Sequence, residues 1–143
     1  MRIAVAADHA AVHEKDAIAQ HLRDAGFEVL DFGTHGDASV DYPDHARPAA
    51  EAVGRGAADR AVLVCGSGVG VCITANQVRG VRAVQVVSPL IAEMSRRHND
   101  ANVACFGARW QDLDTIKSLL ALWLATPFEG GRHAGRVAKI EGC

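Results

Sequence analysis

Aromatic side chains, long apolar runs and an excess of charge of either sign are all scarce in this sequence of 143 residues. Aromatic residues make up only 5%, and Ala and Val dominate the 49% that are hydrophobic, which favours helices packed closely on a sheet. The formal net charge is −2, so nothing in the overall charge predicts binding to nucleic acid or to an anionic membrane. Any bound anion must therefore be held by a few placed cations.

Cysteine is also sparse and is not paired in sequence. Cys65, Cys72, Cys105 and Cys143 form no C-x-x-C motif, which indicates neither a zinc site nor a disulfide framework. No apolar run approaches the roughly 18 residues that a membrane-spanning helix needs. The first residues have the pattern of a strand rather than of a signal peptide, so we expect a protein of the reducing cytoplasm.

Buried strands and amphipathic helices alternate along the chain. The strands are expected near residues 2–7, 27–32, 61–65, 81–87 and 101–106. Helices with apolar residues at helical spacing are expected near residues 12–25, 41–54, 69–76, 88–99 and 112–125. This alternation predicts a single domain over residues 1–143 of the α/β class, a Rossmann-like three-layer α/β/α sandwich with a five-stranded parallel sheet.

The segment from Ala61 to Gly70 carries the strongest chemical signal. Cys65 lies at the end of a buried strand, where parallel α/β sheets place their ligands. Three glycines follow within five residues, and the backbone N–H groups of such a loop at a helix start are suited to an anion. The helix start also stabilises a neighbouring thiolate. The segment predicts a base or nucleophile beside an oxyanion site; an inert buried thiol before a tight turn is the alternative.

Spacing excludes two better-known glycine-loop motifs. The loop reads Gly66-x-Gly68-x-Gly70 after the third expected strand, whereas a dinucleotide fingerprint reads G-x-G-x-x-G and normally follows the first. A cysteine phosphatase loop needs an arginine six residues after its cysteine, and that position is Val71. The loop is therefore neither of these.

Further polar clusters are found near the expected strand ends and in the tail. They are Asp8-His9, Arg97-His98-Asn99 with Arg109, and Arg132-His133-Arg136. Because carboxyl ends of parallel strands share one edge, we expect the clusters after strands one, three and five to converge. A helix cap, a solvated helix end and surface cations are the respective structural alternatives. Together with a thiolate base, such groups suit proton abstraction beside the carbonyl of a phosphorylated substrate.

Five motifs, in order along the whole chain, resemble the type B ribose-5-phosphate isomerase family and its relatives that act on allose, galactose and erythrulose phosphates. The motifs are Ala7-Asp-His-Ala10, Val40-Asp-Tyr-Pro-Asp44, Cys65-Gly-Ser-Gly68, His98-Asn-Asp-Ala-Asn102 and Phe128-Glu-Gly-Gly-Arg-His133. The resemblance implies an aldose–ketose isomerase without metal or organic cofactor, and a homodimer, or a tetramer, with active sites at the subunit interface. Ribose 5-phosphate is the favoured substrate, with a four- or six-carbon sugar phosphate as the alternative. A phosphosugar-binding module is the non-enzymatic alternative.

The resemblance also implies a role for each matching residue. Cys65 would move the proton between C1 and C2, Ser67 would assist transfer between the two oxygens, and His98 would open the sugar ring. The remaining expected roles are an anion hole (Gly66, Gly68 and Gly70, with Asn99 of the partner subunit), hydroxyl contacts (Asp8 and Tyr42) and phosphate contacts (His9, Arg109, Arg132 and Arg136).

The sequence departs from the family pattern at a few positions. Ala11 replaces a usual glycine, Ser88 and Leu90 flank Pro89 where the family has Asp-Pro-Tyr, and Ala108 replaces the second glycine of Gly-Gly-Arg. None of these residues is among the proton-transfer groups. The departures therefore bear on which sugar phosphate fits, not on the class of reaction.

Overall fold

A computed structural model describes residues 1–141, so Cys143 lies outside the described residues. Strands and helices alternate along this range, as the sequence predicted. In chain order the elements are β1 (Arg2–Ala7), the short 3-10 helix η1 (His9–Ala11), α1 (Val12–Asp24), β2 (Glu28–Asp31), α2 (Tyr42–Gly54), β3 (Arg60–Cys65), α3 (Val69–Asn76), β4 (Ala83–Gln85), α4 (Pro89–Asn99), β5 (Val103–Gly107), α5 (Leu113–Ala125) and α6 (Arg132–Ala138).

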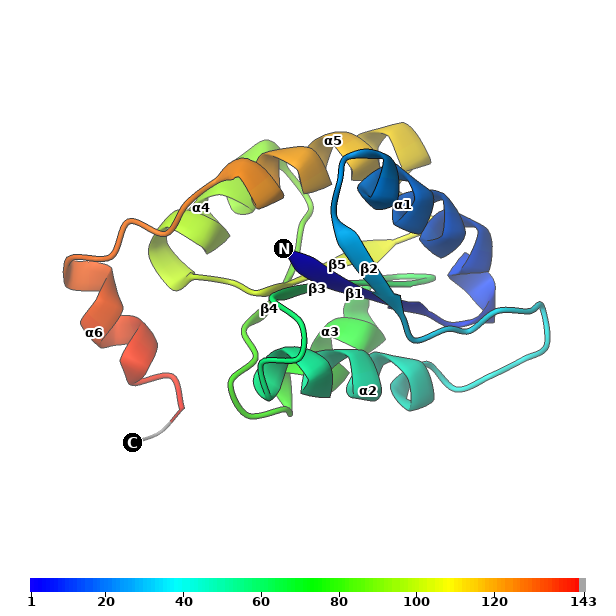
Figure 1. Cartoon of the computed structure of the whole chain (residues 1–143), viewed down its shortest axis with the longest axis horizontal. Helices are drawn as coiled ribbons and strands as arrows, with labels where there is room; N and C mark the ends of the chain where they lie inside the picture. The colour runs from blue at the N-terminus through cyan, green and yellow to red at the C-terminus, as the bar shows by residue number, and fades with distance from the viewer. Residues whose placement is uncertain (142–143) are drawn as a thin grey trace.

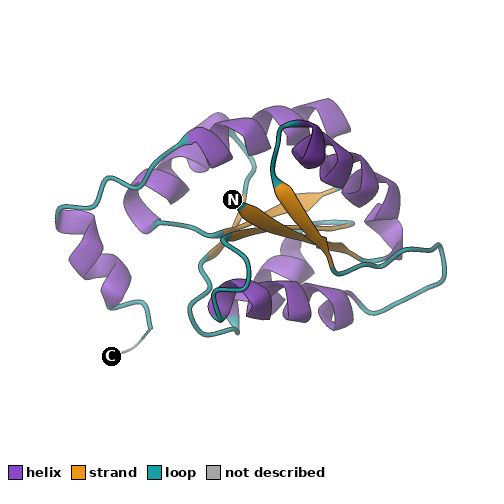
Figure 2. Cartoon of the chain, in the orientation of Figure 1, coloured by secondary structure: helices purple, strands orange, loops and turns teal. Residues whose placement is uncertain are grey.

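All five strands join one parallel sheet in the order β2-β1-β3-β5-β4, so β3 lies at its centre. Helices α1, α4 and α5 cover one face, and α2 and α3 cover the other (Figures 1 and 2). This confirms the predicted three-layer sandwich. The central position of β3 places Cys65, its last residue, in the middle of the carboxyl edge of the sheet.

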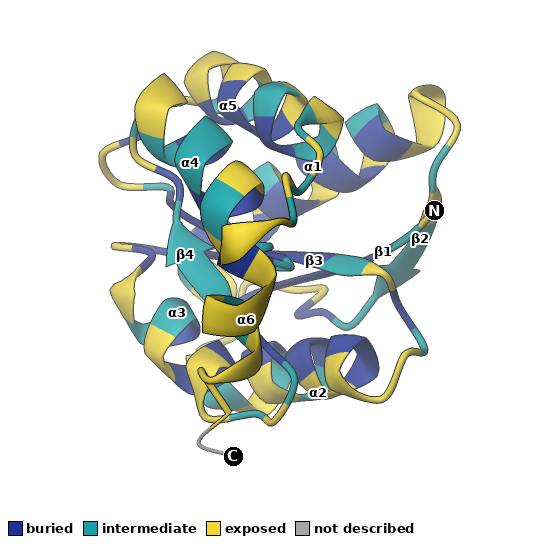
Figure 3. Ribbon diagram, turned by 90° about the vertical axis from the view of Figure 1, so that its left-hand side faces the viewer, coloured by how far each residue is buried: buried dark blue, intermediate teal, exposed yellow. Residues whose placement is uncertain are grey.

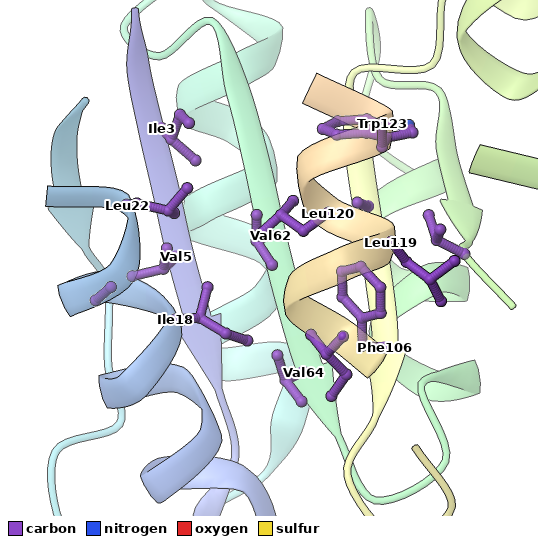
Figure 4. Packing of buried hydrophobic residues seen from close by; sticks show 14 of the residues in the cluster. Ile3, Val5, Ile18, Leu22, Val62, Val64, Phe106, Leu119, Leu120 and Trp123 are labelled. Atoms are coloured by element: carbon purple, nitrogen blue, oxygen red, sulfur yellow. The ribbon is translucent and has the colours of Figure 1, made fainter. Parts of the chain in front are cut away.

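The two faces of the sheet are packed with side chains of different size. On the α1 and α5 face, branched and aromatic residues interdigitate around Phe106 and Trp123 (Figure 4). On the other face the core is mainly alanine, with Ala46, Ala49 and Ala50 of α2 fully or almost fully buried. Small side chains let α2 lie close to the strands, which brings the first turn of this helix next to the carboxyl edge.

Most element boundaries agree with the sequence pattern, and the differences have local causes. The expected fourth strand is shortened to Ala83–Gln85, because β4 is an edge strand that pairs only with β5. Ser88 and Asp112 cap α4 and α5 by accepting hydrogen bonds from the N–H groups of Ile91 at 3.2 Å and Thr115 at 2.8 Å.

The end of α4 lies at the opposite edge of the sheet from Cys65. A helix that leads into a parallel strand delivers its last residues to the amino edge, and α4 leads into β5. The expectation that Arg97, His98 and Asn99 converge with the clusters after strands one and three is therefore wrong within a single chain. Arg109, which follows β5, does lie at the carboxyl edge.

The tail forms helix α6, which extends beyond α4 and away from the layered body (Figure 1). Gly130 and Gly131 precede it with φ of 67° and 55°, a backbone region that glycine adopts readily. Most of α6 is exposed (Figure 3). His133 is its one buried residue. Within residues 1–141, no helix is long and apolar enough to cross a membrane.

Candidate active site

A cavity of about 260 Å³ opens at the carboxyl edge of the sheet, where the segments after β1 and β3 meet the start of α2. With Ala10, it is lined by residues that the sequence had singled out: Asp8, His9, Tyr42, Cys65, Gly66, Ser67, Gly70 and Arg109. The structure therefore groups the predicted base, much of the predicted anion hole and two of the predicted phosphate contacts. Gly68, the remaining loop glycine, contacts Cys65 directly.

The backbone of the glycine loop points a hydrogen-bond donor at the thiol. The N–H of Gly68 lies 3.2 Å from Sγ of Cys65, which is only 5% exposed. Gly68 has φ of 81°, and a Cβ there would lie 2.9 Å from the carbonyl carbon of Phe106, so only glycine fits. The loop at the start of α3 therefore directs a backbone donor at the sulfur atom.

Ser67 is fixed by contacts that the sequence did not predict. Its carbonyl accepts hydrogen bonds from Nε1 of Trp110 at 3.0 Å and from Nε2 of Gln85 at 3.4 Å. Its hydroxyl oxygen accepts from the N–H of Val69 at 3.1 Å. These contacts hold the peptide plane between Ser67 and Gly68. The order of β3, β5 and β4 in the sheet brings the partners together, and that order is not readable from spacing.

Tyr42 covers the start of α3. A Cβ on Gly70 would lie 2.6 Å from the Tyr42 ring, so this close approach requires glycine. Tyr42 is 40% exposed and also borders the neighbouring hollow formed by Asp8, His9 and residues 40–44. The phenol is thus placed beside the glycine loop at the mouth of the cavity.

Asp8 and His9 have structural contacts as well as a place in the cavity. Oδ1 of Asp8 accepts from the N–H of Ala10 at 3.0 Å and caps η1, so the capping alternative is correct but does not remove Asp8 from the site. The N–H of Val40 donates to Nδ1 of His9 at 3.1 Å. The carbonyl oxygen of Val40 lies 3.2 Å from the same nitrogen, so the backbone of Val40 occupies Nδ1 and leaves Nε2 as the ring nitrogen that can face a ligand.

Arg109 is brought to the glycine loop by the backbone. The N–H groups of Ala108 and Arg109 donate to the carbonyls of Cys65 at 2.9 Å and Gly66 at 3.0 Å. The loop after β5 is therefore bound to the loop after β3. This arrangement fixes the backbone of Arg109 beside the loop, and its side chain lies against Gly66 and lines the cavity.

The other predicted residues form a second group, here called the amino-edge group: Arg97, His98, Asn99, Glu129, Arg132, His133 and Arg136. The rings of His98 and His133 are stacked, with centroids 4.2 Å apart and planes inclined by 13°. Asn99 lines a different cavity of about 720 Å³, between the α3–β4 connection, α4 and the end of the described chain. In one chain, these residues do not line the Cys65 cavity.

The pKa values of an acidic and a basic residue of the amino-edge group, Glu129 and His133, are both lowered by their neighbours. Nε of Arg97 donates to Oε2 of Glu129 at 2.9 Å, and this bond, aided by nearby positive charge, lowers the pKa of Glu129. Burial and the neighbouring positive charges of His98 and Arg132 lower the pKa of His133. At neutral pH the carboxyl group is therefore ionised and the buried imidazole is uncharged.

Within residues 1–141, His98, Glu129 and His133 have donor atoms close enough to hold a metal ion, all within 4.8 Å of one another. Arg97 already donates to the carboxylate, and Arg132 and Arg136 add positive charge around His133. These guanidinium groups oppose binding of a further cation. The composition of the group suits an anion better than a metal.

The fold and the cavity define a Rossmann-like α/β protein with a thiol, an N–H-lined loop and an arginine at the carboxyl edge of its sheet. The chain belongs to the Ribose/Galactose Isomerase family, whose model matches residues 3–140.

Named relatives span nearly the whole chain. Ribose-5-phosphate isomerase B of Escherichia coli is 43% identical over 139 residues, which are 97% of this chain and 93% of that protein. D-erythrulose-4-phosphate isomerase of Pectobacterium atrosepticum is 38% identical over 142 residues, covering 98% and 93%. The solved structure of Clostridium thermocellum ribose-5-phosphate isomerase B is 46% identical and covers 99% of this chain and 96% of that chain, with a TM-score of 0.97.

Proposed function

We propose that this protein is an aldose–ketose isomerase that interconverts ribose 5-phosphate and ribulose 5-phosphate. The observation that carries the proposal is the N–H of Gly68 directed at Sγ of Cys65, in a cavity that also holds His9 and Arg109. A buried thiol with this donor is suited to act as a base, and the two basic side chains are suited to an anionic phosphate. The E. coli relative, which matches almost end to end, is named for the same substrate.

In the proposed mechanism, Cys65 takes the proton from C2 of the open-chain aldose. The electron pair of the C–H bond forms a C1–C2 double bond, and the negative charge moves to O1 to give a cis-enediolate. Backbone N–H groups of the loop from Gly66 to Gly70 stabilise this charge where it develops. Ser67 assists proton movement between O1 and O2, and Cys65 returns the carbon proton to C1 to give the ketose.

A ring-opening step must precede proton transfer, because ribose 5-phosphate is mainly a closed furanose. We assign this step to His98, which moves the proton of the O1 hydroxyl to the ring oxygen while the C1–O4 bond breaks. Ribulose 5-phosphate has no such step, since the oxygen that would close its furanose ring carries the phosphate. The two substrates therefore separate ring opening from proton transfer.

We further propose a homodimer in which each Cys65 cavity is completed by His98, Asn99, Arg132 and Arg136 of the partner subunit. Two features support this: within one chain these residues lie away from the cavity, and apolar side chains are exposed on α3 and in the loop after β5. Ile73 and Trp110 are 60% and 55% exposed, as expected of a surface that a second copy covers. A thiol base and a phosphorylated substrate are consistent with the cytoplasm.

A coupled assay tests the proposal and its alternatives. Purified protein is given ribose 5-phosphate, erythrose 4-phosphate and allose 6-phosphate, and ketose formation is followed. We expect ribose 5-phosphate to have the highest kcat/KM. Preference for the four-carbon sugar would assign the activity named for the P. atrosepticum relative instead. Turnover of none of them, with binding retained, would favour a phosphosugar-binding module.

A further inference from the structure

Glu129 lies between two imidazole rings and is anchored on its other side. Oε1 lies 3.7 Å from Nε2 of both His98 and His133. Oε2 accepts from Nε of Arg97 at 2.9 Å, and the N–H of Glu129 donates to the carbonyl of Arg97 at 3.0 Å. Two hydrogen bonds to α4 therefore hold this carboxylate with one oxygen facing both rings.

The two rings differ in their surroundings. The side chain of His133 is only 7% exposed, whereas that of His98 is 37% exposed. Nε2 of His133 is buried without a hydrogen-bond partner, so His133 contributes its ring face rather than a hydrogen bond. One imidazole is thus a fixed platform and the other remains accessible to a ligand.

We propose that Glu129 and His133 are positioning residues for His98 in ring opening; the inference rests on the proposed function above. The stack with His133 fixes the plane of the His98 ring. The carboxylate of Glu129 favours a proton on Nε2 of His98, which leaves Nδ1 to exchange a proton with the sugar. At 3.7 Å the carboxylate oxygen is too far from this nitrogen for a hydrogen bond, so it acts on the ring through its negative charge.

The positioning roles of Glu129 and His133 predict that changes to these residues slow ring opening and no other step of the reaction. During ring opening the C1–O4 bond breaks, C1=O1 forms, and one proton passes from O1 to O4 through Nδ1 of His98. Loss of the correct tautomer or ring plane slows this transfer. Proton abstraction by Cys65 and phosphate binding should be left unchanged, because the side-chain contacts of Glu129 are with Arg97, His98 and His133, and none of these is the base or a proposed phosphate contact.

The test compares two reactions of the full-length protein. Net conversion of ribose 5-phosphate requires ring opening, whereas exchange of the C1 proton of ribulose 5-phosphate with D2O, followed by NMR, does not. We expect Glu129→Gln to lower kcat for net conversion by about tenfold or more, in line with the worth of a positioned acid–base group. Exchange should stay within about twofold of the unaltered protein.

Companion variants separate positioning from folding. Glu93→Gln removes a carboxylate elsewhere on α4 and should change neither reaction. His133→Ala should show the same split as Glu129→Gln, and His133→Phe, which keeps a stacking ring, should restore most of the net conversion. The 15N shifts of His98 should show the proton on Nε2, and a mixture of tautomers in Glu129→Gln.

Three results would overturn the inference: equal loss of both reactions in Glu129→Gln, no loss of either, or a His98 proton on Nδ1. Equal loss would mean that Glu129 supports substrate binding or folding instead. Failure of the unaltered protein to catalyse both net conversion and exchange would refute the proposed function itself, and is thus distinguishable.

Discussion

The carboxyl-edge cavity and the amino-edge group contain comparable chemistry but are built in different ways. The cavity around Cys65 is formed by loops that follow neighbouring central strands and are joined by backbone hydrogen bonds, such as Arg109 to Gly66 at 3.0 Å. The amino-edge group depends on the end of α4 and on α6, a mostly exposed helix. Under the proposed function, the groups for proton transfer are therefore preorganised within one chain, whereas two of the phosphate contacts, Arg132 and Arg136, are carried on residues 128–138, here called the arm.

The two regions also differ in charge and accessibility. The cavity holds one arginine, Arg109, and its thiol, Cys65, is almost fully buried. In the amino-edge group, by contrast, Arg97, Arg132 and Arg136 are all exposed. Arg97 already donates to Glu129, whereas Arg132 and Arg136 are the two residues of this group that we propose bind phosphate. Changes in the two regions should therefore have separable effects.

The largest effect is expected at the base. Cys65→Ala should lower kcat for ribose 5-phosphate by about 10²-fold or more, because the general base is lost. Binding of the sugar phosphate, measured by calorimetry, should be nearly unchanged, since its phosphate contacts are on other residues. Cys72→Ala, which removes a half-buried thiol of α3, is the matched control and should stay near the original rate. Near-normal kcat in Cys65→Ala would eliminate Cys65 as the base.

The next effect concerns the arm. Arg132→Ala and Arg136→Ala should each raise KM by about 10- to 100-fold, because a charged hydrogen bond is worth about 1.5–3 kcal/mol. The two residues are one helical turn apart on α6, so both guanidinium groups can face one phosphate. Arg23→Ala, an exposed cation of α1, is the control. Unchanged KM and kcat in both variants would remove the arm from the phosphate site.

The smallest predicted effect is on how the free energy of unfolding depends on pH, and it arises in the amino-edge group. The pKa of His133 is lowered, first by burial and then by the charges of His98, Arg132 and Arg136, with Glu129 opposing them. The unfolded chain therefore binds a proton at higher pH than the folded chain. At neutral pH the uncharged His133 therefore contributes to the free energy of unfolding. This contribution should fall as the pH drops below the ordinary histidine pKa of about 6.5, and the loss should level off below the pKa of His133 in the folded protein.

Urea unfolding between pH 7.5 and 5, roughly the range in which histidines titrate, measures this loss. His133→Phe lacks the titrating group but keeps a ring on His98, so its midpoint should fall less steeply than that of the unaltered protein. Identical slopes for the two proteins would show that His133 does not titrate as its burial implies.

Most of the fold and the whole Cys65 segment were predictable from sequence, because both depend on residues that are close together along the chain. Apolar runs and glycines specified the strands, and a strand end followed by Gly66, Gly68 and Gly70 specified the loop. The contacts of Trp110 and Gln85 with Ser67 were not predictable, because they depend on which strands are neighbours in space.

The expectation that His98 lies at the same sheet edge as Cys65 within one chain was wrong, although the chain order contained the information. Residues just before a parallel strand lie at its amino edge, so His98, before β5, and Cys65, after β3, cannot share an edge. The course of α6 is a different case. Gly130 and Gly131 permit many directions, and only the contacts of Glu129 and His133 with α4 show where the arm lies.

The central claim is that each active site combines the cavity of one copy with the amino-edge group of another. It is tested most directly by mixing Cys65→Ala protein with an Arg132→Ala/Arg136→Ala double variant, after unfolding and joint refolding. Random pairing gives half heterodimers, each with one intact site of two, so about a quarter of the original activity should return from two nearly inactive proteins. No recovery, despite confirmed heterodimers, would contradict the shared site.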